Sequence, residues 1–312
     1  MQKGKIGVGV MVLLTALFTG CLDESEFEKQ QKISDKQISE YLSTNGIEAD
    51  QSSFGIYYEQ LTDQTGGEAP STGDIVQVRY LLMTLDGDTL ETRLDDTVQF
   101  KFNWNSVIPR GINYGVDILH QGEKIRFYLP SYTAYEEYAP EDHSFAPYSN
   151  FIVEMELVDI LSEEEMHISE VDAIDSYLME QGLTDMTPSS SGLYYQTIEA
   201  GDGDSPKNYN QVVLHYSRKY LDGTVIQETE PDNPLTVSLA SGQLVEGFYE
   251  GVMKMKEGEK ALLIMPSDLA FGSSIEIMPS YLRAELFAYG YLTSNVKPYA
   301  PVIYEVELVE IK

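Results

Sequence analysis

Among the residue types that serve as nucleophiles or metal ligands, this chain has a single cysteine and four histidines. Cys21 is the only cysteine, so an intramolecular disulfide is excluded. His120, His143, His167 and His215 show none of the short spacings that metal sites use. No Ser-His-Asp or Cys-His arrangement indicates a nucleophilic enzyme. We therefore expect no metal and no cofactor.

Cys21 follows a segment with the features of an export signal. Two lysines give a positive start, and residues 6–18 are apolar or small apart from one threonine. That run has the length of a signal-peptide core and is short for a membrane-spanning helix. It ends at Phe18-Thr19-Gly20-Cys21, which resembles a bacterial lipobox with Phe18 in the usual leucine position. We expect residues 1–20 to be removed and Cys21 to carry lipid; an ordinary signal peptide with an incidental cysteine is the alternative.

The residues after the cysteine are acidic. Leu22-Asp23-Glu24-Ser25-Glu26 is similar to the surface-export signal of Bacteroidota lipoproteins, and a solvated acidic tether fits equally well. The chain as a whole has 51 acidic and 20 basic residues, for a formal charge of −31. Such a surface repels phosphate backbones, which argues against a nucleic-acid partner. We expect a membrane-anchored lipoprotein that faces the periplasm or the cell surface. The outer membrane is the membrane in which we expect it.

The chain contains an internal repeat. Gly55-Ile56-Tyr57-Tyr58 recurs 137 positions later as Gly192-Leu193-Tyr194-Tyr195. Near the end of each copy, Glu154-Met155-Glu156-Leu157 matches Glu305-Val306-Glu307-Leu308 at an offset of 151, so the second copy holds about 15 extra residues. Two copies are too few for a solenoid, which predicts two tandem globular domains.

Each copy opens with a predicted helix. The first covers 34–45 with Ser34 as a possible N-cap, the second covers roughly 169–182, and both are expected as spacers that pack partly on their own domain. Alternating strand patterns follow, with one short helical stretch per copy at about 113–120 and 248–256. This pattern predicts α+β domains with curved antiparallel sheets. The predicted organisation is a tether and helix at 21–53, domain 1 at 54–161, a linker helix at 162–190, and domain 2 at 191–312 with an inserted loop at about 273–295.

The order of motifs in both copies resembles the FKBP-type peptidyl-prolyl isomerase family. In the first copy the resemblance rests on Val78-Arg79-Tyr80, Gly122-Glu123-Lys124 and Pro130-Ser131. In the second it rests on Gly258-Glu259-Lys260 and the run 266–272. The resemblance implies two FKBP-like domains, each a curved antiparallel sheet wrapped around one short helix. It also implies an apolar cleft that binds an X-Pro peptide and speeds rotation about the X-Pro bond, which needs no nucleophile and no cofactor.

The resemblance assigns cleft residues in domain 1. Tyr80, Glu91 and Tyr135 take the catalytic places, with Glu91 where the family usually has Asp and the Tyr135 hydroxyl as a donor to the substrate carbonyl. The substrate-binding places, which have lost aromatic area, are Leu90, Phe100, Val107, Ile108, Ile112, Phe145 and Val153. Aromatic residues on strands are core residues more often than ligand contacts, and that interpretation stays open for each of them.

In domain 2 the corresponding substrate-binding places are Tyr216, Ile226, Gln227, Leu235, Leu244, Val245, Phe248, Phe271, Val296 and Tyr304. At the floor of the cleft, Phe248 is larger than its counterpart Ile112 in domain 1. Gln227 takes the place of the acid Glu91, and Phe271 lacks the hydroxyl of its counterpart Tyr135. We expect the inserted loop at 273–295 to extend beside this cleft, where it covers the pocket or offers a chaperone-like apolar surface.

These assignments predict a membrane-anchored peptidyl-prolyl cis-trans isomerase that assists the folding of exported proteins, with their X-Pro segments as partners. The alternative is a non-catalytic peptide-binding or chaperone module, because both clefts depart from the family pattern. A glycan-binding lipoprotein is a third class, and no motif supports it. The sequence leaves open which domain is active.

Overall fold

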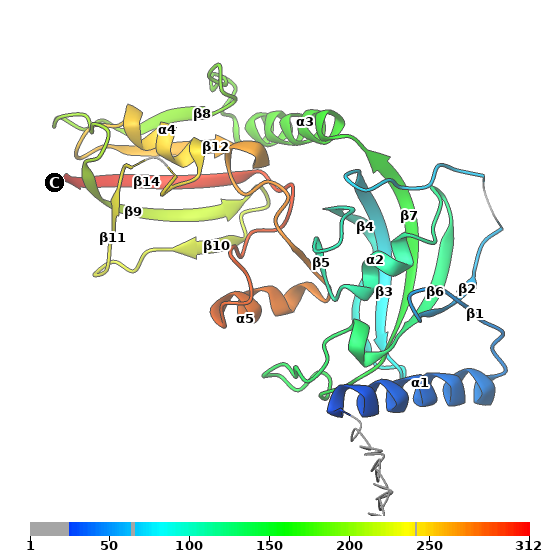
Figure 1. The fold of residues 1–312 in the computed structure, drawn as a ribbon. Coiled ribbons are helices and arrows are strands. Elements are labelled where there is room, and N and C mark those ends of the chain that lie inside the picture. The colour runs from blue at the N-terminus through cyan, green and yellow to red at the C-terminus, as the bar shows by residue number, and fades with distance from the viewer. Residues whose placement is uncertain (1–24, 64–65, 241) are drawn as a thin grey trace, which may run out of the picture.

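The computed structural model describes residues 25–63, 66–240 and 242–312. The predicted signal peptide and Cys21 lie outside the described residues. The described chain forms two α+β domains joined by a helix, which confirms the predicted fold class (Figure 1). Among the helices of these residues, none combines the length and the apolar character needed to cross a bilayer.

Domain 1 is a six-stranded antiparallel sheet in the order β1-β2-β6-β7-β3-β4. Side chains alternate between the faces of β3, so that Val76, Val78, Tyr80 and Leu82 all enter one apolar cluster with α2. The elements are α1 (Glu26–Asn45), β1 (Asp50–Gln51), β2 (Tyr57–Gln60), β3 (Ile75–Thr84), β4 (Thr89–Lys101), β5 (Val107–Ile108), α2 (Gly111–Val116), β6 (Lys124–Leu129), the 3-10 turn η1 (Ser131–Thr133) and β7 (Phe151–Leu161).

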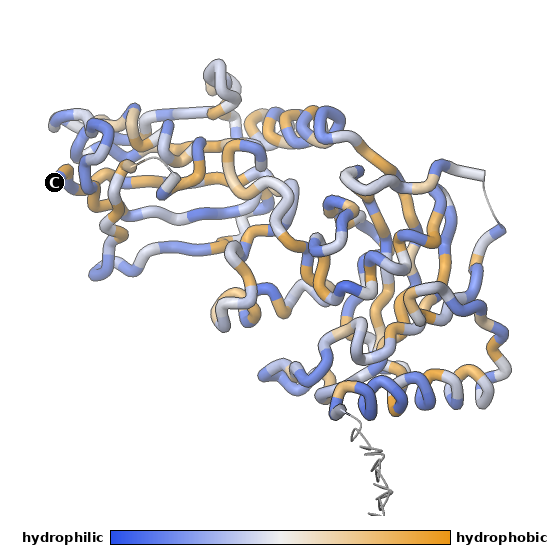
Figure 2. The backbone as a smooth tube through the Cα atoms, viewed as in Figure 1, coloured by the Kyte–Doolittle hydropathy of each residue, from blue (hydrophilic) through white to orange (hydrophobic). Residues whose placement is uncertain are grey.

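Domain 2 repeats this plan with strand order β10-β9-β14-β12-β8, and β11 also pairs with β9. The elements are α3 (Glu163–Gln181), β8 (Tyr194–Glu199), β9 (Gln211–Tyr220), β10 (Val225–Glu228), β11 (Leu235–Ser238), α4 (Glu246–Lys254), β12 (Lys260–Met265), the 3-10 turn η2 (Ser267–Leu269), β13 (Glu276–Ile277), the 3-10 turn η3 (Ser280–Leu282), α5 (Arg283–Ala288) and β14 (Val302–Ile311). Apolar residues recur along the strands of both sheets (Figure 2).

The short helix of each domain lies close to its sheet because glycines face the strand below. A Cβ atom on Gly115 would lie 2.5 Å from the ring of Phe127, and one on Gly251 would lie 2.4 Å from Leu263. Both pairs keep the 136-residue spacing of the repeat. Each helix begins two residues earlier than predicted, at Gly111 and Glu246. The repeat therefore preserves a packing contact as well as a sequence pattern.

The opening helix α1 is longer than predicted. It begins at Glu26 behind a capping box formed by Ser25, so the prediction that Ser34 is the N-cap is wrong. Ser34 is buried, and its hydroxyl lies 2.6 Å from that of Ser131. Ile38 packs in a cluster with β6 and β7. The helix alternates hydrophilic and hydrophobic residues because one face lies against domain 1 (Figure 2).

Helix α3 joins the domains and packs on domain 2. Ser162 forms a capping box with Glu165, and the acidic run 163–165 forms the first turn, where carboxylates favour the positive end of the helix dipole. Glu170 is buried and accepts hydrogen bonds from the Ser267 backbone at 2.5 Å and its hydroxyl at 2.7 Å. Burial raises the pKa of Glu170.

The inserted segment of domain 2 lies on domain 1. Its strand β13 pairs in parallel with β5 of domain 1 and forms a separate two-stranded sheet. The end of the predicted insertion, Asn295, lies beside the cleft of its own domain, where it contacts Arg218. The apolar side chains of the insertion were also expected there, and they join the domain 1 cluster instead. Helix α5 follows and lies between the domains (Figure 1). The peptide bonds Ile108–Pro109 and Met278–Pro279 are cis.

Replacing Gly115 with valine is expected to destabilise domain 1, because the new side chain has no room beside Phe127. Overpacking of this kind costs about 1–3 kcal/mol. Thermal unfolding followed by circular dichroism would show a lower midpoint. The matched control is Asp117→Val at the exposed end of the same helix, for which the midpoint stays nearly unchanged. Equal midpoints for both variants would contradict the close approach of helix and sheet.

Candidate functional site

The positions predicted for the domain 1 cleft come together in space. They line one apolar cluster between β3, β4, β5, α2 and β7. Leu90 and Ile108 are partly buried at its margin, and the others are buried: Tyr80, Phe100, Val107, Ile112, Tyr135, Phe145 and Val153. Tyr135, Phe145 and Phe151 are in mutual ring contact, with centroids 5.0 to 5.9 Å apart. Packing thus unites residues that are far apart in the sequence.

Glu91 is the acid of this cleft. The Tyr80 hydroxyl donates to its Oε2 at 2.5 Å, and Arg93 Nε donates to its Oε1 at 3.2 Å. Burial, followed by the charge of Glu91, raises the pKa of Tyr80, so this phenol remains a donor. Burial lowers the pKa of Arg93, but Glu91 and Asp96 outweigh that effect, so the net pKa is raised and the guanidinium stays charged. Sequence reasoning did not identify Arg93.

The domain 1 cleft is occupied by main chain from domain 2. Glu276 pairs with Val107 and Ile277 with Ile108 in the two-stranded sheet. The amide of Met278 donates to the Ile108 carbonyl at 2.8 Å. Val107 and Ile108, two of the predicted substrate-binding residues, therefore pair through their backbone with a segment of this same chain.

Two predicted catalytic residues contact the occupying segment on either side of Pro279. The Tyr135 hydroxyl donates to the carbonyl oxygen of Met278 at 2.6 Å. The Ser280 amide donates to Glu91 Oε2 at 2.8 Å, and the Ser280 hydroxyl donates to Oε1 at 2.5 Å. Burial, then the neighbouring tyrosines and acids, raises the pKa of Tyr135 far enough to keep it protonated. Donor and acceptor thus bracket one proline.

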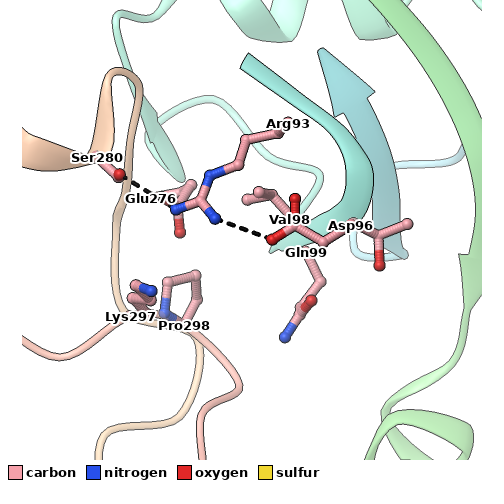
Figure 3. A pocket seen from close by; sticks show the side chains of 9 residues that line it. Arg93, Asp96, Val98, Gln99, Glu276, Ser280, Lys297 and Pro298 are labelled. Atoms are coloured by element: carbon pink, nitrogen blue, oxygen red, sulfur yellow. Dashed lines mark hydrogen bonds and ion pairs between the residues drawn. The ribbon is translucent and has the colours of Figure 1, made fainter. Parts of the chain in front are cut away.

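A small polar hollow lies beside this segment. Its volume is about 150 Å³, and its lining includes Asp96 and Gln99 from β4 together with Glu276 and Lys297 from domain 2. Arg93 reaches across it and donates to Asp96 at 2.9 Å and to the Ser280 hydroxyl at 3.3 Å (Figure 3). The hollow marks the boundary between the two domains, with charged groups from both sides.

The domain 2 cleft has a different content. Its predicted floor, Phe248, stacks on Tyr304 with ring centroids 4.6 Å apart, and Tyr216 lies at 5.8 Å from both rings. Val296 is fully buried. The remaining predicted positions are exposed Gln227 and the partly buried Ile226, Leu235, Leu244, Val245 and Phe271.

Arg218 occupies the space between these residues. Its guanidinium lies 4.5 Å from the centroid of Phe271, and it donates to Tyr304 at 3.2 Å and Gln227 at 2.8 Å. It also donates to Asn295 at 2.9 Å, and only 7% of the residue is exposed. Sequence reasoning did not identify Arg218. The signal was available, because Tyr216 and Arg218 are two positions apart on one strand and therefore point to the same face.

No metal site is apparent in the part of the chain that the structure describes, where no group of three or more His, Cys, Asp or Glu residues could hold an ion. The two clefts differ instead in their hydrogen-bonding groups. Domain 1 offers a hydroxyl donor and a carboxylate acceptor around a proline, and domain 2 holds a resident cation. The domain 1 cleft thus places a donor and an acceptor around an X-Pro segment of the same chain.

Comparison with known proteins names the family. The family model for FKBP-type peptidyl-prolyl cis-trans isomerases matches residues 66–158 and 203–309, and the chain belongs to this family. The two matched stretches confirm the predicted pair of FKBP-like domains.

Individual relatives match a single stretch of the chain. FkpA of Escherichia coli K12, an FKBP-type peptidyl-prolyl cis-trans isomerase, is 30% identical over 128 residues, which are 40% of this chain and 39% of the relative. The peptidyl-prolyl cis-trans isomerase Mip of Chlamydia pneumoniae is 33% identical over 101 residues, 32% of this chain and 38% of the relative. The chain thus spans about two fifths of the length of these relatives.

Two solved structures are also similar. The three FKBP domains of wheat FKBP73 cover 83% of this chain and 96% of their own at 21% identity, with a TM-score of 0.33. FkpA from Escherichia coli covers 48% of this chain and 64% of its own at 26% identity, with a TM-score of 0.35. The family assignment rests on the two stretches matched by the family model.

Replacing Glu91 with alanine is expected to destabilise the contact between the domains. Four donors lose their acceptor: the Tyr80 hydroxyl, Arg93 Nε and both donors of Ser280. A buried donor without a partner costs about 1–3 kcal/mol, so the free energy of unfolding falls by roughly 2 kcal/mol or more. Urea unfolding measures the loss, and hydrogen exchange at the Ser280 amide rises with it.

Asp96→Ala is the matched control, because Asp96 also pairs with Arg93 but is 59% exposed and makes no hydrogen bond to Ser280. Its effect is expected to stay within about 0.5 kcal/mol. If the two variants lost equal stability, Glu91 would act through Arg93 and not through domain 2.

Proposed function

We propose that this protein is a peptidyl-prolyl cis-trans isomerase whose working cleft is that of domain 1. The observation that carries the proposal is the hydrogen bond from the Tyr135 hydroxyl to the carbonyl of Met278, the residue that precedes Pro279. That carbonyl belongs to an X-Pro amide, which is the group that isomerisation rotates. Membership of the isomerase family supports the same activity.

Rotation about an X-Pro bond is slow because amide resonance creates a barrier of about 18–20 kcal/mol. The domain 1 cleft surrounds the amide with apolar side chains, including Phe100, Ile112 and Val153. An apolar surrounding disfavours the polar planar amide relative to the twisted, less resonant one, which lowers the barrier. Tyr135 holds the carbonyl, and Glu91 accepts hydrogen bonds from the residue after proline. Rotation is thereby confined to the bond between these two anchors, and no covalent bond breaks.

We assign domain 2 a non-catalytic role, in which it holds the segment that occupies the domain 1 cleft. Arg218 lies among Gln227, Phe271 and Tyr304, the positions where a proline ring would bind. Phe271 stands where domain 1 has the hydroxyl of Tyr135, so the donor to the substrate carbonyl is missing. The non-catalytic alternative from the sequence is therefore favoured for this domain alone.

We further propose that the protein is a lipoprotein held by an acylated Cys21, in the outer membrane and facing the periplasm or the cell surface, where X-Pro segments of exported proteins are its substrates. The signal-like segment before Cys21 and the absence of any other cysteine support this proposal. Helix α1 begins at Glu26, which leaves only a short tether after Cys21. Anchoring would raise the local concentration of the domains near emerging clients.

Removing the Tyr135 hydroxyl is expected to lower the isomerisation rate at saturating peptide by about three- to tenfold, the value of a hydrogen bond to a neutral group near 1 kcal/mol. The measurement is exchange NMR on a proline peptide with Tyr135→Phe in the full chain. Tyr304→Phe removes a wall hydroxyl from the domain 2 cleft, where no X-Pro carbonyl is bound, and leaves the rate unchanged. A loss in Tyr304→Phe alone would place the activity in domain 2, and no rate above background in the parent chain would sink the proposed activity.

Replacing Cys21 with serine is expected to release the protein from the membrane. Stable anchoring needs two or more acyl chains, which serine at this position does not receive. The measurement is fractionation of a producing bacterium together with incorporation of labelled palmitate. The parent chain is expected in the membrane fraction with label, and Cys21→Ser in the soluble fraction without it. Equal membrane retention of both chains would contradict the lipid anchor.

A further inference from the structure

The occupant of the domain 1 cleft is a defined unit, residues 275–292, which we call the docked segment. Ile277 and Met278 are fully buried, and Pro279 is buried between them and Ser280. The side chains that leave domain 2 and join the domain 1 cluster are Ile277, Met278, Leu282, Leu286 and Leu292. These side chains are part of the domain 1 core, although the segment belongs to domain 2. The segment therefore binds domain 1 as a peptide ligand does.

A second set of contacts holds the loop that carries Tyr135. The Tyr138 hydroxyl donates to Glu285 at 2.6 Å, and the hydroxyls of Ser144 and Tyr281 lie 2.7 Å apart. Tyr289 donates to Glu141 at the surface. The loop over the cleft is therefore pinned to the docked segment from outside as well as from within.

The docked segment is internally stiffened. Arg283 is buried and donates to the carbonyls of Ile275 at 2.8 Å and Val296 at 3.1 Å. Its guanidinium also lies 3.2 Å from the carboxylate of Glu276, whose side chain is 4% exposed. These contacts join the middle of the segment to its start and to Val296, which follows the segment in domain 2. A ligand that is already ordered loses little further entropy when it binds.

We propose that the docked segment is a built-in competitor of the domain 1 cleft, which must leave before a client segment of the same chemistry binds there. That chemistry is two apolar residues, a proline and then a residue with a hydroxyl, as in Ile277-Met278-Pro279-Ser280. The proposal rests on the proposed function, because it names the substrate class and the regulation of the same site. Glu91 sets the preference after proline, since it accepts both the amide and the hydroxyl of Ser280.

Competition follows from shared atoms. One Tyr135 hydroxyl cannot donate to the carbonyls of Met278 and of a client at the same time, and the Ile108 carbonyl already accepts from Met278. A tethered ligand acts at an effective concentration on the order of millimolar. A client peptide at micromolar concentration is therefore largely excluded until the segment is released.

The test uses the full chain and a labelled peptide with the sequence of residues 276–280. Leu286→Asp places a charge where α5 enters the domain 1 cluster and is expected to release the segment. Ala284→Asp is the matched control, since it adds the same charge at an exposed position of the same helix. Removing a competitor of millimolar effective concentration is expected to tighten peptide binding by about tenfold or more in Leu286→Asp. The control binds like the parent chain, and equal dissociation constants for all three chains would overturn the proposal.

Hydrogen exchange on the parent chain gives a measurement that needs no variant. The amides of Met278 and Ser280 are bonded to domain 1 and are expected to exchange slowly. Saturating peptide is expected to speed their exchange, because it displaces the segment. If Leu286→Asp does not fold, this measurement decides: unchanged exchange at both amides with peptide bound overturns the proposal.

Two further results separate this proposal from the proposed function. Tighter peptide binding in Leu286→Asp without any isomerisation supports the built-in competitor and sinks the catalytic function alone. Isomerisation at equal rates in the parent and Leu286→Asp, with equal peptide affinities, supports the catalytic function and overturns the built-in competitor. A peptide with aspartate in place of its serine is expected to bind at least about tenfold more weakly beside Glu91. Equal affinity for both peptides would overturn the assigned preference after proline.

Discussion

The hydrogen bonds on the two sides of Pro279 govern how this molecule is assembled. Tyr135 holds the carbonyl before the proline, and Glu91 holds the amide and hydroxyl after it. Each of these groups lies in an apolar surrounding, where a polar group without a partner is costly. Each domain therefore provides hydrogen-bond partners for the other: domain 1 supplies the acceptor and the donor, and domain 2 supplies the peptide. The β5–β13 pairing extends this exchange along the main chain.

The two copies have diverged in what fills their clefts. The position occupied by Leu82 in domain 1 is occupied by Arg218 in domain 2, and the same comparison gives Val153 against Tyr304. Domain 1 has lost aromatic walls, and the side chains of Ile277 and Met278 fill the space. In domain 2 the rings of Phe248 and Tyr304 stack, and the guanidinium of Arg218 lies over Phe271. A shared fold thus carries a receptor in one copy and a ligand in the other.

Helix α3 keeps the ligand close to its receptor. Met166 of this helix packs between Ile75 of domain 1 and Tyr299 of domain 2. Glu163 in its first turn accepts hydrogen bonds from Lys101 at 2.7 Å and from the Tyr299 hydroxyl at 3.0 Å. These contacts limit how far the domains separate, which sets the high effective concentration of the docked segment. Release of that segment must break the β5–β13 pairing and the hydrogen bonds on the two sides of Pro279.

The sequence by itself determined the repeat, the α+β class and the family, because strand alternation and motif spacing are local properties that survive divergence. It also placed Tyr135 and Glu91 in one cleft through the family resemblance. It did not determine that Ser34 faces Ser131, or that residues 275–292 leave their own domain. Those outcomes depend on contacts between residues far apart in the chain, such as the bond from Tyr135 to Met278, and no local pattern encodes such a pairing. Only the tertiary structure decided which cleft the insertion fills, since the choice rests on complementary apolar surfaces and hydrogen-bonding groups that exist once both domains have folded.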